Sequence, residues 1–436
     1  MRKRFLSIAM AASFTMLFNA QQIKFEEYDL PNGLHVILHQ DNSAPVVTTS
    51  VMYHVGAKDE AAGRTGFAHF FEHLLFEGTK NIKRGEWFKI VSSNGGSNNA
   101  NTDPDRTYYY ETFPSNNEQL GLWMEAERLR HPVINQIGVD TQREVVKEEK
   151  RLRMDNQPYG GLFNAILTTL FKKHPYKGTV IGSMEDLNSA KLEEFNAFFK
   201  KYYIPNNATL VVAGDIKPEQ TKKWINEYFG SIPKGTPITR NFPKETPITQ
   251  EFEETVYDAN IQIPAYIFAY RTPAAKERDA YILNMLGSYL SKGKSSVLYK
   301  KLVDNEKKAL AVEAFNLGLV DHSIFAFFAI PMGNTSKDVL KKDIDAEIKK
   351  LQTDLISEED YQKLQNQLEN DFVNANSSVE GIANTLADSY LLKGNTNLIN
   401  EEINIYRSIT REDLRNAARK YLNSNQRAII NYLPKK

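Results

Sequence analysis

The sequence predicts an α+β fold built from two similar halves. At 436 residues the chain is too long for one ordinary core, and the usual domain size favours two or three domains. Runs rich in β-branched and aromatic residues alternate with amphipathic stretches in both halves. A proline-rich segment without periodicity lies between them. We therefore expect two α+β domains of similar size, produced by an ancient duplication.

Each expected element follows from its local pattern, since β-rich runs predict strands and a 3.6-residue period predicts helices. In the first half the expected strands are 34–38, 46–53, 107–112 and 208–213, and the expected helices are 67–76, 118–130, 140–154, 220–229 and one through Phe195 and Phe199. In the second half the expected strands are 265–270, 325–330 and 427–432, and the expected helices are 276–290, 335–354, 358–375, 378–392 and 411–421.

The same patterns predict the limits of the domains. Residues 1–20 are expected to be a signal peptide, 21–232 the N-terminal domain, 233–248 a linker and 249–436 the C-terminal domain. The signal peptide has a basic start, an apolar run of about 14 residues and a small residue at Ala20. That run is shorter than the roughly 20 residues that span a bilayer, and an uncleaved anchor is the alternative. We expect a secreted or periplasmic protein without stable membrane insertion after cleavage.

Composition narrows the chemistry. Lys plus Arg and Asp plus Glu both number 54, so the formal charge is zero and gives no indication of nucleic-acid binding. The chain has no cysteine, which excludes disulfides, thiolate metal sites and a cysteine nucleophile. A metal ion in this chain must therefore be held by histidine and carboxylate groups.

The segment from His69 to His73, with the sequence HFFEH, carries the strongest chemical signal. Histidines four residues apart on a helix project from one face, so both imidazoles can bind one ion. Glu72 lies close enough to act as general base on a water molecule, and H-x-x-E-H is the inverted zincin motif. The alternative is a pair of partly exposed histidines on a surface helix. The surrounding phenylalanines oppose it, because burying unpaired polar groups is costly.

A third ligand must come from elsewhere, and the helix expected at 140–154 offers two adjacent carboxylates. Glu148 and Glu149 point about 100° apart around the helix axis. Glu149 shares a face with Val145 and Leu152, whereas Glu148 falls on the charged side. Because such a charged run is more often a solvated face than a ligand, the pattern alone leaves the choice open.

At these residues the sequence resembles the pitrilysin-type peptidases, a family of inverzincin zinc metallopeptidases that includes insulysin and the mitochondrial processing peptidase. The matching segments are 66–79, 95–102, 203–208 and 295–299, so the resemblance covers essentially the whole chain after residue 20. It implies two α+β domains, each a mainly antiparallel sheet packed with helices, that together form half of an enzyme. Two such halves would face each other around a chamber that holds peptides.

The resemblance also implies one zinc ion per chain, held by His69, His73 and Glu149, with Glu72 as general base. The N-terminal domain would then bind the metal, and the C-terminal domain would be of the inactive type. Asn99 and Ala100 would lie on an edge strand that pairs with the substrate backbone. Ordinary turn chemistry is the alternative for Asn99.

Two departures from the family pattern matter. Where the family often has an acidic residue two helical turns before the ligand glutamate, this chain has Gln142, whose amide can still hydrogen-bond near the metal. Active relatives carry an arginine and a tyrosine in the second half, where this chain shows Val303 and Val312 unless the alignment is shifted.

These residues together predict a zinc metalloendopeptidase that hydrolyses peptides or small unfolded polypeptides. The two valines predict a dimer in which a paralogous subunit supplies the arginine and the tyrosine. The alternative is a non-catalytic peptide-binding or chamber-forming subunit of a heteromeric peptidase complex.

Overall fold

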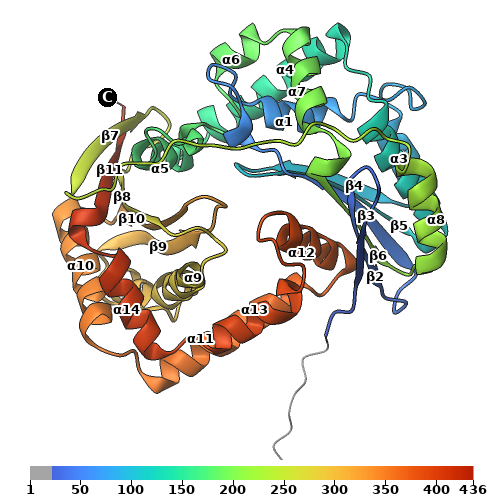
Figure 1. Ribbon diagram of the computed structural model, residues 1–436. Helices are drawn as coiled ribbons and strands as arrows, with labels where there is room; N and C mark the ends of the chain where they lie inside the picture. The colour runs from blue at the N-terminus through green and yellow to red at the C-terminus, as the bar shows by residue number, and fades with distance from the viewer. Residues whose placement is uncertain (1–21, 436) are drawn as a thin grey trace, which may run out of the picture.

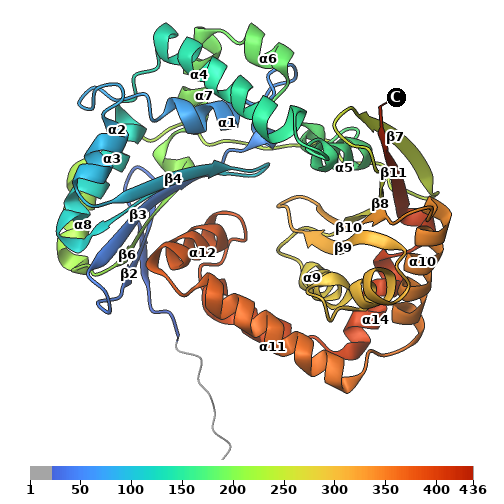
Figure 2. The ribbon, with the colours of Figure 1, turned by 180° about the vertical axis from the view of Figure 1, so that it is seen from behind.

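The computed structural model describes residues 22–435 as two sheet-and-helix units that lie side by side (Figure 1). The expected signal peptide at 1–20 lies outside these described residues. The two sheets occupy opposite ends of the molecule, and the helices of the second half extend from one sheet toward the other (Figure 2). In residues 22–435 no helix is both long enough and apolar enough to cross a membrane.

The first sheet is mixed and has six strands, with one parallel pair, β2 with β6. In sheet order its strands are β1 (Glu26–Asp29), β2 (His35–Gln40), β6 (Ala208–Gly214), β3 (Val46–Tyr53), β5 (Thr107–Pro114) and β4 (Ser97–Thr102). The helices of this half are α1 (Phe67–Leu74), α2 (Trp87–Ser93), α3 (Glu118–Arg130), α4 (Gln136–Lys150), α5 (Leu162–Leu170), α6 (Met184–Ser189), α7 (Leu192–Tyr202) and α8 (Pro218–Phe229). Strand β4 stands at the edge of the sheet, beside α1.

The second sheet has five strands, and only β11 with β7 runs parallel. In sheet order its strands are β7 (Phe252–Asp258), β11 (Arg427–Pro434), β8 (Ala265–Thr272), β10 (Ser323–Pro331) and β9 (Ala309–Leu317). Its half contains α9 (Arg278–Ser291), α10 (Lys337–Thr353), α11 (Glu358–Ala375), α12 (Val379–Leu391), α13 (Leu398–Arg407) and α14 (Arg411–Tyr421). The predicted fold class, two α+β domains with mainly antiparallel sheets, is confirmed.

The two halves exchange one helix each. Helix α5 lies between β5 and β6 of the first sheet in the sequence, yet its Ile166 packs with Ile267 and Ile430 of the second sheet. Helix α12 of the second half packs Leu386 against the first sheet, in the cluster that holds Met52. Each sheet has two apolar faces. The helices from the same half of the chain cover one face, and the helix from the other half covers the second face.

A buried ion-pair cluster joins the halves at the tips of two hairpins. The Lys58 side chain is almost fully buried, and its Nζ lies 2.7 Å from Asp105 Oδ1 and 2.9 Å from Asp321 Oδ2. The Tyr176 hydroxyl donates to Asp105 Oδ1 at 2.6 Å, and the backbone N–H of Val320 donates to Asp105 Oδ2 at 2.9 Å. The β9–β10 turn is therefore tied to the β4–β5 turn of the first half.

The segment 233–248 has no helix or strand, but it is attached along its length. The Gly235 N–H donates to the Asn206 side chain at 2.8 Å, and Arg240 Nε donates to Asp59 Oδ1 at 2.6 Å. Farther along, Glu245 Oε1 accepts the N–H of His174 at 2.7 Å. The connection between the halves is thus a fixed strap across the first half.

Replacing the buried lysine is expected to loosen this junction. Lys58→Met leaves Asp105 and Asp321 side by side without a cation, so the variant should lose about 3 kcal/mol of unfolding free energy. Urea denaturation of the purified protein measures the change. Lys89→Met, which removes an exposed pair with Glu86, is the control and should cost less than about 0.5 kcal/mol. Equal midpoints for the two variants would contradict the assignment.

Candidate metal centre

Helix α1 carries the motif and begins at Gly66, whose φ is 90°. A Cβ at this position would lie 2.8 Å from Gly182 Cα, so the close approach requires glycine. The Glu60 carboxylate accepts the N–H of Gly66 and of Ala68, both at 2.9 Å. A carboxylate at the positive end of a helix is favourable, so the start of α1 is fixed from outside the helix.

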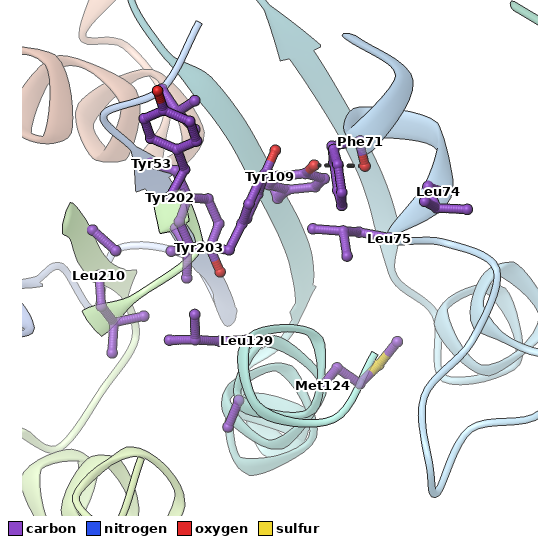
Figure 3. Packing of buried hydrophobic residues seen from close by; sticks show 14 of the residues in the cluster. Tyr53, Phe71, Leu74, Leu75, Tyr109, Met124, Leu129, Tyr202, Tyr203 and Leu210 are labelled. Atoms are coloured by element: carbon purple, nitrogen blue, oxygen red, sulfur yellow. Dashed lines mark hydrogen bonds between the residues drawn. The ribbon is translucent and has the colours of Figure 1, made fainter. Parts of the chain in front are cut away.

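The apolar side chains of α1 fix its rotation. Phe67 stacks on Phe195 of α7, with ring centroids 4.6 Å apart, and Phe70 packs against the same ring at a tilt, with centroids 4.5 Å apart. At the other end of the helix, the Tyr109 hydroxyl donates to the carbonyl of Phe71 at 3.0 Å (Figure 3). Because the phenylalanines face the core, the polar residues of the motif face outward together.

Helix α4 brings Glu149 to this site and leaves Glu148 in solvent. The Glu149 side chain is 15% exposed and the Glu148 side chain is 56% exposed. The face expected to hold Val145, Val146, Glu149 and Leu152 is buried only in part: Val146 is buried, whereas Val145 and Leu152 are 43% and 56% exposed. Glu149 follows Val146 at helical spacing.

Three ligand atoms converge at the site. His73 Nε2 lies 3.1 Å from Glu149 Oε2, and His69 Nε2 lies 3.6 Å from the same oxygen. One ligand atom from each residue falls within 4.8 Å of the others, and within residues 22–435 this is the one such group of histidine and carboxylate side chains. Two imidazoles and one carboxylate with an open side is the donor set of catalytic zinc sites, so these residues fit Zn²⁺.

The surroundings favour the protonation states that bind a metal. Burial, with the neighbouring His73, lowers the pKa of His69 to about 4, which keeps its imidazole neutral. The hydrogen bond with His73 lowers the pKa of Glu149, which keeps it ionised. Arg153 pairs with Glu149 Oε1 at 2.9 Å, which leaves Oε2 directed at the histidines.

Glu72 lies on the same helix with a different environment. Burial raises the pKa of its carboxyl group, and its Oε2 accepts a hydrogen bond from Thr102 Oγ1 at 2.7 Å. A raised pKa makes the carboxylate a stronger base toward the proton of a water molecule. No sequence pattern distinguishes Thr102, although it is the last residue of the matching segment 95–102.

The remaining predicted residues occupy three different places. Asn99 and Ala100 lie on the edge strand β4. The Gln142 amide donates to Glu77 near the end of α1, and within residues 22–435 it has no hydrogen bond to the three ligand residues. Val303 lies in a helical turn, and Val312 is buried on β9.

Comparison with known proteins identifies the family. Residues 35–183 match the family model described as Insulinase (Peptidase family M16), and residues 189–368 match the one described as Peptidase M16 inactive domain. The zinc protease PqqE of Helicobacter pylori is 32% identical over 412 residues, which cover 93% of this chain and 92% of that protein. The chain belongs to peptidase family M16. The resemblance found in the sequence is thereby confirmed.

Solved structures of M16 proteins share the whole fold. A protease from Helicobacter pylori has a TM-score of 0.90 at 30% identity, over 95% of this chain and all of that one. The periplasmic protease PqqL of Escherichia coli has a TM-score of 0.77 at 18% identity, and the match covers 94% of this chain but 47% of that one. This M16 chain thus corresponds in length to half of PqqL. His69, Glu72, His73 and Glu149 all lie within the matched residues 35–183.

Replacing Glu149 or Glu148 by glutamine shows which of the two carboxylates is the third zinc ligand. Glu149→Gln is expected to weaken zinc binding by more than about 100-fold, because a neutral amide replaces a charged ligand. Glu148→Gln, the exposed neighbour, is the matched control and should bind zinc like the unchanged protein. Zinc content after dialysis against a metal buffer measures both, and equal retention by both variants would exclude Glu149 as a ligand.

Proposed function

We propose that this M16 protein is a zinc-dependent metalloendopeptidase that hydrolyses peptides or small unfolded polypeptides. The convergence of His69, His73 and Glu149 beside the buried Glu72 carries the proposal. The printed name of its Helicobacter pylori relative, a zinc protease, supports the same class of reaction. One zinc ion per chain is the stoichiometry that this group of ligands supports.

Zinc bound by these three side chains would supply a Lewis acid that acidifies a water molecule and polarises the scissile carbonyl. Glu72 takes the proton of the attacking water on its carboxylate and later gives it to the leaving amine. The raised pKa of Glu72 suits the first step, because the carboxylate of a stronger acid would be too weak a base to take the proton from water.

The edge strand β4 supports an extended substrate. Its Ser97, Asn99 and Asn101 are exposed and alternate with half-buried residues, among them Ala100, as in a strand with one open side. A peptide can add to such an edge through main-chain hydrogen bonds, with Asn99 and Ala100 at its centre. Only an extended segment can pair in this way, which favours peptides and unfolded chains over folded proteins.

The second half of the chain lacks the arginine and tyrosine of active relatives, and a partner subunit would supply them. Val312 is 4% exposed on β9 and cannot contact a substrate, and residues 189–368 match the inactive domain of the family. We assign the missing arginine and tyrosine to a paralogous subunit in a dimer, in keeping with the half-length match to PqqL. The basic and apolar start of the sequence, together with the periplasmic PqqL, supports a secreted or periplasmic site of action.

The proposed reaction requires the Glu72 carboxylate, whereas zinc binding does not require it. Glu72→Gln should retain zinc and lower kcat by about 100- to 10,000-fold, because the amide cannot carry the proton. Zinc analysis and cleavage of a quenched fluorescent peptide measure the two properties, for the chain alone and mixed with the paralogous subunit.

The same assay also tests the alternative function, a non-catalytic subunit. Unchanged cleavage by Glu72→Gln would reject the catalytic role of this chain and leave a peptide-binding or chamber-forming subunit. Full activity of the isolated chain would reject the need for a partner while leaving the zinc chemistry in place.

A further inference from the structure

We infer that Thr102 is a positioning residue for the base Glu72, and that it links the base to the strand on which the substrate pairs. The inference rests on the proposed peptidase function and names a residue that holds the machinery without touching the substrate. It follows from one side-chain contact, from the way the turn after Thr102 is built, and from the place of Thr102 on β4.

The contact is a hydrogen bond of ordinary length from a hydroxyl to a carboxylate oxygen. Thr102 Oγ1 donates to Glu72 Oε2 at 2.7 Å, and within residues 22–435 this hydroxyl is the one hydrogen-bond donor to that carboxylate. Hydrogen bonds to an ionised group are about twice as strong as neutral ones. A β-branched side chain has a restricted χ1 angle, so Oγ1 of Thr102 keeps its direction better than a serine hydroxyl would.

The backbone that carries Thr102 is fixed immediately after it. Asp103 Oδ1 accepts the N–H of Arg106 at 2.9 Å and closes the turn, while its carbonyl accepts the N–H of Ala57 at 3.2 Å. Gly56 packs so closely that a Cβ there would lie 2.4 Å from the Asp103 carbonyl oxygen. The hydroxyl is thus held in place before any substrate binds, which is the requirement for a positioning group.

The position of Thr102 in the sheet connects Glu72 to the strand proposed to bind the substrate. Thr102 is the last residue of β4, the edge strand that carries Asn99 and Ala100. A peptide paired with this edge and the carboxylate that acts on it are therefore both held by the same strand. Since small misplacements of reacting groups are costly, the hydrogen bond from Thr102 keeps the Glu72 carboxylate aligned with the strand on which the peptide pairs.

The test compares Thr102→Val, which keeps the shape and removes the hydroxyl, with Thr102→Ser. Thr102→Val should lower kcat by about 10- to 100-fold, the effect of one hydrogen bond to a charged group. KM should change by less than about threefold, because the strand edge is intact. Zinc content should be unchanged, and Thr102→Ser should recover kcat to within about fivefold.

Two further measurements separate positioning from a general structural effect. Thr112→Val removes a hydroxyl pair with Thr48, 2.8 Å long, elsewhere in the same sheet. This control should keep kcat. A crystal structure of Thr102→Val should show the Glu72 carboxylate displaced from its place beside β4, which reports the role without any activity measurement.

The outcomes are distinguishable. Wild-type kcat in Thr102→Val, an unmoved Glu72 carboxylate, or equal losses in Thr102→Val and Thr112→Val would each overturn the inference and leave the peptidase proposal standing. Cleavage that survives Glu72→Gln would overturn the peptidase proposal, and the positioning role with it.

Discussion

The eight residues of α1 must meet two opposed solvation demands. One face has to bury phenylalanine rings against α7, and the other has to hold two imidazoles and a carboxylate with little water around them. Burial of polar groups is tolerable only where each finds a partner. Glu149, Thr102 and the metal that fits this group are those partners. The second helix, the edge strand and the turn behind it are all arranged to bring them to α1.

The parts of this arrangement that could be predicted are those written in local sequence. The limits of β3, α3, α11 and α14 coincide with the expected 46–53, 118–130, 358–375 and 411–421, because each has a clear period and clear ends. The zinc motif was recognisable because both histidines and the base lie within one helical turn. Elements with weak or short patterns were missed, namely β1, β7, β9, α2, α5, α6 and α13.

What escaped prediction depends on contacts between distant segments. The pattern of α4 left the choice between Glu148 and Glu149 open, and the resemblance to the family favoured Glu149. Of the apolar residues expected on the same face, Val146 is buried and Val145 and Leu152 are exposed. Thr102 lies 30 residues after Glu72, to which it donates a hydrogen bond, and Glu60 lies eight residues before Ala68, whose N–H it accepts. Neither residue belongs to a sequence motif that would mark its role. Tertiary packing determines the roles of such residues, and contacts between distant segments cannot be predicted from a single sequence.

The exchange of α5 and α12 bears on how the chain can be divided. Because the strap at 233–248 lies between them, a cut there would yield two fragments, each carrying the helix that the other needs. Neither fragment could cover its own sheet, and each would expose an apolar face of the kind that drives aggregation. Together they would reassemble without a covalent link, as two interlocking pieces. The two halves are thus complements, since the loss of either would leave an apolar face of the other sheet uncovered.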